Sequence, residues 1–158
     1  MGKRKSWTEK LNDVGDLPKV VKIEGKMTRR WGEGTVVIPS PREVYDLMRS
    51  VPEGKLTTIN EIRSALARRH AATICCPITA GIFAWVSANA SEEERAAGGE
   101  GIPYWRTLKS GGVVNEKYPG GVEIQKALLE KEGHRLVRKG TKNVSHRVLD
   151  LEKSLYAP

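Results

Sequence analysis

Residues 71–90 carry no charged side chain, although 29% of the residues in the chain are charged. An uncharged run of this length could cross a membrane, but Pro77, Gly81 and Asn89 make it a poor span. Proline suits the first position of a helix, so we predict a buried helix that begins at Pro77 and ends near Asn89. The side chains that recur at helical spacing, and that we expect this helix to bury, are Ile78, Ile82, Trp85 and Val86.

A second helix is predicted just before this one. Thr58, with Glu61 three residues later, has the pattern of a capping box, in which two side chains satisfy backbone N–H groups at a helix start. A turn over about 70–76 would then join the two helices. Two consecutive helices with a short joint have the order of a helix-turn-helix. The inner face of the first of them would consist of Ile59, Ile62 and Leu66.

Three further segments flank this pair, one before it and two after it. Ser40, Pro41 and Glu43 predict the start of an earlier helix that ends before Pro52. Downstream, the acidic and glycine-rich segment 91–101 is predicted to be a loop. The segment 111–121 has glycines at both ends, which is typical of a hairpin or wing.

The C-terminal part is predicted to begin with a helix after Gly121 and to end it at Gly133. We expect Ile124, Ala127 and Leu128 to point inward from that helix. The tail alternates basic and apolar residues, which predicts a short hairpin followed by a turn of helix. The fold class that these patterns favour is α+β, mainly α, with a winged helix-turn-helix.

The N-terminal 36 residues are basic and contain few apolar residues, so we interpret them as an arm. A solvated tail and a docked arm both fit this composition. Val20, Val21 and Ile23 could form a short strand, and Trp31 could anchor the arm to the body. The expected organisation is an arm over 1–36, a folded domain over 37–135 and a basic hairpin or tail over 136–158.

The charge balance favours a polyanionic partner. Lysine and arginine number 27 against 19 acidic residues, which gives a net charge of +8 and an isoelectric point near 9.6. The two cysteines, Cys75 and Cys76, provide neither a disulfide framework nor a zinc-ligand set. We therefore expect an intracellular, cytoplasmic protein with no metal and no cofactor, nucleoid-associated in a prokaryote or nuclear in a eukaryote.

Several motifs between Val44 and Gly133 resemble, in the right order, the DNA-binding and active-site domain of O6-alkylguanine-DNA alkyltransferases. VPEGKLTTINEI resembles the turn that opens the family's helix-turn-helix, and Asn89 takes the place of its hinge asparagine. IPYWR stands where the family has Ile-Pro-Cys-His-Arg. Ser110, Gly111 and the later Tyr118-Pro-Gly-Gly resemble the loop that closes over a flipped base. IQKALLEKEG resembles the helix that carries the family's glutamate, here Glu132.

The resemblance implies that the family's chemistry is lost. In the transferases the cysteine of this motif takes the alkyl group from guanine, and a thiolate suits that role because it is soft and nucleophilic. Tyr104 stands there instead, and a phenol with a pKa near ~10 is a poor nucleophile at neutral pH. Trp105 replaces the histidine, and its indole can only donate a hydrogen bond. The chain therefore resembles the cysteine-lacking alkyltransferase-like proteins, which implies a non-enzyme that binds alkylated bases.

The base-flipping residues of the family also differ here. Ile59 stands where the family has a tyrosine that helps to rotate the nucleotide. No arginine lies in CCPITAGI, where the family has one near the start of the recognition helix. The partners that the resemblance implies are double-stranded DNA and excision-repair proteins, with the chain itself a monomer and no membrane involved.

The candidate contact residues follow from the resemblance and from the charge pattern. Tyr104 and Trp105 could stack on a base or could plug the old pocket, and both interpretations stay open. Arg106 could hold a phosphate or fix its loop. The predicted contacts to DNA and bases are Thr79, Ala80, Gly81, Asn89, Pro103, Tyr104, Trp105, Arg106, Ser110, Gly111 and Tyr118. The predicted phosphate contacts are Arg29, Arg30, Arg68, Arg69, Arg135, Arg138 and Lys139.

Two alternatives remain at this stage. Cys75 and Cys76 precede a predicted helix N-terminus, where the helix dipole lowers a thiol's pKa, so a methyltransferase or other thiol enzyme is possible. More often such cysteines are small buried hydrophobic residues. The other alternative is a non-catalytic protein-interaction module on the same fold.

Overall fold

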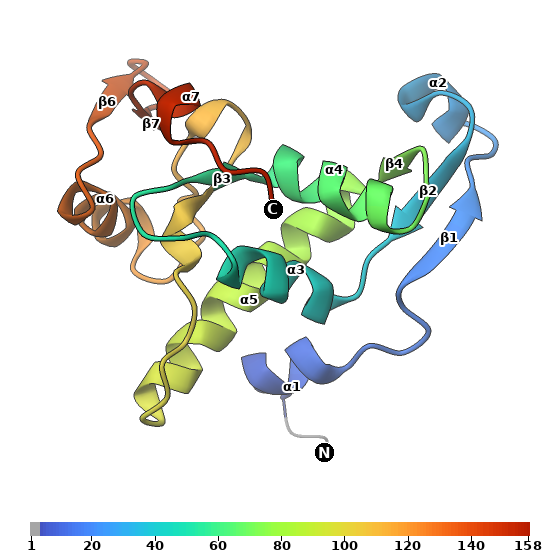
Figure 1. Cartoon of the computed structure of the whole chain (residues 1–158), viewed down its shortest axis with the longest axis horizontal. Helices are drawn as coiled ribbons and strands as arrows, with labels where there is room; N and C mark the ends of the chain where they lie inside the picture. Colours follow the sequence, from blue (N-terminus) through green and yellow to red (C-terminus); the bar gives the residue numbers. More distant parts are fainter. Residues whose placement is uncertain (1–3) are drawn as a thin grey trace.

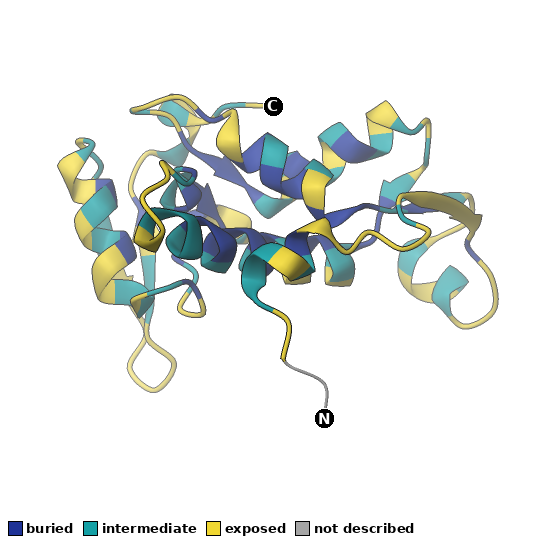
Figure 2. Cartoon of the chain, turned by 90° about the horizontal axis from the view of Figure 1, so that it is seen from below, coloured by how far each residue is buried: buried dark blue, intermediate teal, exposed yellow. Residues whose placement is uncertain are grey.

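Helix α5, Pro77–Ala96, is the element around which the molecule is arranged in the computed structural model, which describes residues 4–158 (Figure 1). Three other helices pack against it: α1 (Trp7–Asn12), α3 (Pro41–Arg49) and α4 (Ile59–Arg69). Their buried apolar side chains form the largest core cluster. Figure 2 places the buried residues along this centre and most of the exposed residues in the peripheral loops.

The helix starts follow the sequence closely. Ser40 caps α3 in a complete capping box with Glu43, and Pro41 is the first helical residue. The Thr58 hydroxyl accepts a hydrogen bond from the Glu61 N–H at the start of α4. Pro77 begins α5, as predicted. The helix pair α4–α5 is therefore present, and residues 70–76 join its two members.

Helix α5 extends seven residues beyond its predicted end near Asn89, so the expected loop at 91–101 is helical over its first six residues. Tertiary partners account for the extension. The Glu93 carboxylate accepts hydrogen bonds from the backbone N–H groups of Trp7 and Thr8, both at 2.9 Å, and so caps α1. The Glu94 carboxylate accepts one from the Tyr45 hydroxyl at 2.7 Å.

The buried face of α5 also differs from the prediction. Val86 is buried and Trp85 partly so, but Ile78 is 56% and Ile82 49% exposed. The helix instead buries a face of small side chains, which lets the neighbouring helices approach closely. This face consists of Ala80, Ala84, Ser87, Ala88 and Ser91.

The N-terminal segment is docked rather than solvated, and only residues 1–3 of the expected arm lie outside the described part of the chain. Leu11 of α1 is fully buried, and Trp7 packs edge-on against Trp85 with ring centroids 4.6 Å apart. Because this segment contributes to the core, the expected arm is part of the folded body.

A three-stranded sheet lies at the end of the molecule that carries α2 (Met27–Trp31). Strand β1 (Lys19–Lys22) pairs antiparallel with β2 (Thr35–Ile38), which pairs in parallel with β4 (Ile74–Cys75). The expected boundary at residue 36 therefore falls inside β2. Trp31 packs on a small cluster of Ile23, Val36 and Cys76, so it anchors this region as expected.

The other end of the molecule contains the C-terminal elements. Strand β3 (Thr57–Thr58) pairs in parallel with β5 (Thr107–Leu108), and β6 (Leu136–Lys139) pairs antiparallel with β7 (Ser145–Val148). The short helix α7 (Leu151–Ser154) follows, so the tail is a hairpin and a turn of helix, as predicted.

Helix α6 (Gly121–Lys131) begins where predicted, but it buries Gln125 and Leu129 instead of the expected Ile124, Ala127 and Leu128. The segment before it has a 3₁₀ turn at Ser110–Gly112 and isolated bridges rather than the regular hairpin that we expected for a wing. The described chain is thus a mixed helix and strand fold, 46% helical. None of its helices is both long and apolar enough to pass through a bilayer.

Candidate nucleic-acid interface

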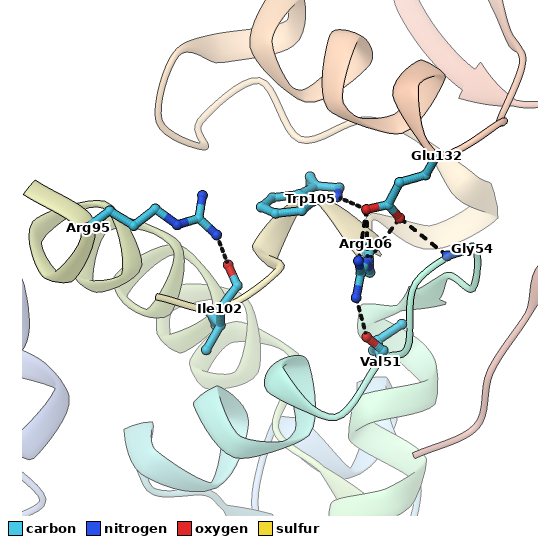
Figure 3. A network of polar contacts seen from close by, with 7 residues as sticks. All are labelled: Val51, Gly54, Arg95, Ile102, Trp105, Arg106 and Glu132. Atoms are coloured by element: carbon cyan, nitrogen blue, oxygen red, sulfur yellow. Dashed lines mark hydrogen bonds and ion pairs between the residues drawn. The ribbon is translucent and has the colours of Figure 1, made fainter. Parts of the chain in front are cut away.

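The loop that carries Trp105 and Arg106 is tied to Glu132 at the C-terminal end of α6 (Figure 3). The Trp105 indole N–H donates to Glu132 Oε2 at 2.8 Å. The Arg106 guanidinium donates to both carboxylate oxygens, from Nε at 2.9 Å to Oε1 and from Nη2 at 2.9 Å to Oε2. Such a bidentate pair fixes both side chains in one geometry.

The same network reaches the turn that opens the helix-turn-helix. Arg106 Nη1 donates to the Val51 carbonyl oxygen at 2.8 Å, and the Gly54 N–H lies 3.4 Å from Glu132 Oε1. Three segments that are distant in sequence therefore meet at one carboxylate. Arg106 fixes its loop, which was one of its two predicted roles.

Glu132 is held as an anion. Burial of the carboxyl opposes ionisation, but hydrogen bonds from Arg106 and Trp105 outweigh it and leave the pKa of Glu132 below its ordinary value. Both neighbours donate hydrogen bonds and neither can accept one, so neither can take up a proton and relay it to the carboxylate. The arrangement makes Glu132 a structural anchor.

Tyr104 is enclosed by other rings. It is 1% exposed, and the rings of Trp105 and Tyr118 contact it edge-on with centroids 5.5 and 5.6 Å away. Burial raises the pKa of Tyr104 to about 12. The Arg95 guanidinium lies 5.0 Å from the Trp105 ring centre and donates to the Ile102 carbonyl oxygen at 2.9 Å. In this conformation the Tyr104 ring is buried and the Trp105 ring is partly exposed.

Gln125 joins this loop to the segment before α6, and sequence reasoning missed it. The side chain is fully buried, its amide donates to the Trp105 carbonyl oxygen at 3.1 Å, and its Oε1 accepts from the Asn115 N–H at 2.9 Å. A glutamine on a helix is usually exposed, so its type alone gives no signal for this role.

The outward face of α5 is open. Ile78, Gly81, Ile82 and Trp85 line a pocket of about 350 Å³ together with the segment 109–117. From that segment come Lys109, Asn115, Glu116 and Lys117. Glu116 pairs with Lys109 at 3.0 Å. The sequence analysis assigned both isoleucines to the core because they recur at helical spacing, so it did not predict that they lie on the surface.

The residues predicted to contact DNA differ in how exposed they are. Thr79, Gly81 and Pro103 are partly exposed, and Ser110 and Gly111 are exposed. Ala80 and Tyr118 are buried, as is Tyr104, so none of these three presents a side chain to a ligand in this conformation.

Asn89 differs from the expected hinge in its position. It lies inside α5 rather than after it, and its amide donates to the Trp85 carbonyl oxygen one turn earlier, at 2.9 Å. Its side chain is therefore used within the helix.

The predicted phosphate contacts are all exposed, but they do not form one cluster. Arg29 and Arg30 lie on α2, Arg68 and Arg69 on α4, and Arg138 and Lys139 on β6, with Arg135 just before it. Figure 1 places α2 and β6 at opposite ends of the long axis. Arg69 also pairs with Glu43 at 3.4 Å.

The cysteines lie in the core. Cys75 is 1% exposed, and burial raises its pKa to about 12. Cys76 is 7% exposed and its sulfur accepts a hydrogen bond from the Thr79 hydroxyl at 3.2 Å. Both cysteines are thus the small buried residues that the sequence favoured, and at Cys75 desolvation outweighs any lowering of the pKa by the helix dipole. Residues 4–158 contain no group of three or more metal-ligating side chains.

Two solved structures have the same fold as this chain. One is S. pombe Atl1 in complex with damaged DNA containing O6-carboxymethylguanine, and the other is S. pombe ATL in complex with DNA. Each matches with a TM-score of 0.52 and 24% sequence identity, over 75% of this chain and 94% of the other.

The resemblance expected from the motifs is therefore confirmed at the level of the fold, which fits an alkyltransferase-like architecture. No model of a protein family matches the chain, and no curated protein matches it.

Proposed function

We propose that this chain is a non-enzymatic DNA-binding protein that recognises alkylated or otherwise modified bases in double-stranded DNA. The observation that carries the proposal is the fold shared with S. pombe Atl1, whose solved structures hold DNA, in one case with O6-carboxymethylguanine. A net charge of +8 suits a polyanionic partner.

The absence of alkyl transfer is part of the proposal, and two features of the described residues support it. Tyr104 occupies the loop position of the acceptor, and it is buried with a pKa of about 12. The negative charge of the Glu132 carboxylate is balanced by its ion pair with Arg106. The Trp105 indole beside it can donate a hydrogen bond but cannot accept one. Neither side chain is arranged to form or activate a nucleophile.

In this proposal the pair α4–α5 is the helix-turn-helix, α5 is the helix that meets the duplex, and the segment 109–121 acts as the wing. The lysines of that segment and the exposed arginines of α4 would contact phosphates. The chain would act as a monomer and leave the lesion to excision-repair proteins.

A binding titration tests this function. Two labelled duplexes of identical sequence, one with a single O6-methylguanine, are titrated with the protein at two salt concentrations. We expect tighter binding of the modified duplex, and affinities for both duplexes that fall as salt rises because phosphate contacts release counterions. Equal affinities for the two duplexes would mean that the protein binds DNA without recognising the lesion. If neither duplex is bound with salt-sensitive affinity, the chain is a protein-interaction module instead.

Intact-protein mass spectrometry after incubation with the methylated duplex tests the absence of transfer. We expect an unchanged mass. A gain of one methyl group that is lost in a Cys75→Ser or Cys76→Ser variant would instead identify a thiol enzyme.

A further inference from the structure

Strand β1 has a free edge at the outer side of the three-stranded sheet (Figure 1). Within the described residues it pairs with β2 alone. All four of its residues are exposed, including two adjacent valines, Val20 at 43% and Val21 at 41%. Branched apolar side chains of a strand normally pack against a neighbour. An exposed edge of this kind is a surface on which a further strand can pair.

The register of the β1–β2 pair identifies the free backbone groups. The Ile23 N–H donates to the Gly34 carbonyl oxygen at 2.9 Å, directly after the antiparallel ladder of β1 and β2. Residues that face the partner strand alternate along such a ladder, so the backbone of Val21, like that of Ile23, faces β2. The N–H and C=O groups of Val20 and Lys22 therefore point away from β2, toward the free edge.

An apolar cavity of about 260 Å³ adjoins this edge where the sheet meets α2. Val21, Ile23 and Val36 line it together with Met27 and Trp31 of α2. Side chains alternate between the two faces of a sheet, so a residue added opposite Val21 would place its side chain on the same face, at this cavity. An added strand could thus anchor one apolar side chain here.

The charges around the edge indicate an acidic partner. The segment 19–31 contains five basic residues and one acidic residue, Glu24. Lys19 pairs with Asp16 at 3.1 Å. Four further basic side chains are exposed and form no ion pair with any described residue: Lys22, Lys26, Arg29 and Arg30. A second copy of the chain would bring two such basic surfaces together, and like charges across an interface oppose association.

We propose that the free edge of β1 binds an extended acidic segment of a partner protein, which adds a fourth strand to the sheet. Acidic side chains of that segment would lie beside Lys19 and Lys22, and an apolar side chain between them would enter the cavity at Val21. The order acidic, apolar, apolar, acidic complements the four residues of β1. None of these four is assigned to DNA, so this binding site does not depend on the proposed function.

The probe is a fluorescein-labelled peptide with Glu-Leu-Val-Glu at its centre, and anisotropy measures its binding to the full chain. One control peptide has Lys-Leu-Val-Lys at its centre, and another carries methyl groups on the backbone nitrogens that would face β1. The protein variants are Lys19→Glu with Lys22→Glu and, as matched control, Lys131→Glu with Lys153→Glu. In each pair both lysines are exposed and one of them forms an ion pair. Thermal unfolding confirms that each variant folds.

We expect the acidic peptide to bind the wild type and the control variant equally. It should bind Lys19→Glu with Lys22→Glu about tenfold more weakly, because two cross-strand attractions become repulsions. That variant should instead prefer the Lys-Leu-Val-Lys peptide. Hydrogen exchange locates the bound peptide, because it should protect the amides of Val20 and Lys22 while the amide of Val21 is protected with and without it.

The proposal is wrong if the acidic and basic peptides bind the wild type equally, or if the methylated peptide binds as well as the acidic one. Unchanged exchange at Val20 and Lys22 in the complex would contradict an added strand. If no peptide binds but the exchange of both β1 lysines for glutamate weakens binding to duplex DNA, the edge is a nucleic-acid contact. The lesion titration is unaffected by these outcomes, so the proposed function is tested separately.

Discussion

The loop of Trp105 and the outer face of α5 use their side chains in opposite ways. In the loop, the Trp105 indole and the Arg106 guanidinium both donate to Glu132, and the Gln125 amide donates to the Trp105 carbonyl oxygen. On α5, Ile78 and Ile82 contact solvent beside an open pocket. The loop that resembles an active site is thus built as a clamp, and the open pocket lies beside the neighbouring helix.

The largest effect that this comparison predicts is on stability at the clamp. In Glu132→Ala, Arg106 and the Trp105 indole lose their acceptor in a site where the Glu132 side chain is 8% exposed. Removing one partner of a buried ion pair costs about 3 kcal/mol, so we expect a loss of that order in the free energy of unfolding, measured by urea titration.

The matched control for this change is Glu130→Ala on the same helix. Glu130 is exposed and lies 4.0 Å from Lys126, and an exposed pair of this kind contributes little. Equal losses for the two variants would show that the Glu132 network is not a clamp.

The pH dependence of stability tests whether the Glu132 carboxylate is ionised and paired. Burial alone would raise the pKa of Glu132, but Arg106 and Trp105 hold it below its ordinary value of 4.5. A carboxyl with a depressed folded-state pKa stabilises the fold above its unfolded-state pKa and loses that contribution as the pH falls through the folded-state value.

The comparison is between the wild type and Glu132→Gln, which lacks the titrating group. We expect the wild type to be more stable at neutral pH and the difference in unfolding free energy to shrink as the pH falls below about 4.5. Other carboxyls with lowered pKa values, such as Glu43 and Glu93, are common to both proteins and cancel in the difference. A difference that is constant from pH 7 to pH 3 would contradict an ionised, paired Glu132.

Local sequence rules predicted the parts of the fold that depend on neighbouring residues. The capping box of Ser40 and Glu43 and the helix start at Pro77 involve side chains within three or four positions, so the sequence pattern is sufficient. The end of α5 was missed because it depends on the distant segments at Trp7 and Tyr45, whose hydrogen bonds recruit Glu93 and Glu94.

The face of α5 was misassigned for a related reason. Two stripes on this helix are compatible with burial, one of large side chains such as Ile78 and Ile82 and one of small ones such as Ala80 and Ala84. Hydrophobic periodicity favours the large stripe. The molecule buries the small stripe, and only the close approach of neighbouring helices, which a single sequence does not reveal, decides between them.

In the candidate site, the resemblance singled out Trp105, Arg106 and Glu132, but it did not predict that Trp105 and Arg106 both donate to the Glu132 carboxylate. It did not predict that Tyr104 is enclosed by Tyr118 and Trp105, because that enclosure depends on how the segment before α6 folds back.

The smallest predicted effect is that of a substitution at Gly81, which separates the contribution of α5 to stability from its contribution to DNA binding. Gly81 is a helix-interior glycine with open space where a Cβ would lie, so Gly81→Ala should raise the free energy of unfolding by about 0.5–1 kcal/mol. The same methyl group would project into the pocket that Gly81 lines together with Ile78 and Ile82, so the affinity for duplex DNA should fall while stability rises. Thermal unfolding and anisotropy titration measure the two effects on one variant.

Opposite signs would locate the DNA-binding surface at this face, because loss of folding cannot weaken binding in a protein that has become more stable. Unchanged affinity in the stabilised variant would place the duplex elsewhere on the molecule and leave the exposed isoleucines without a role in DNA binding.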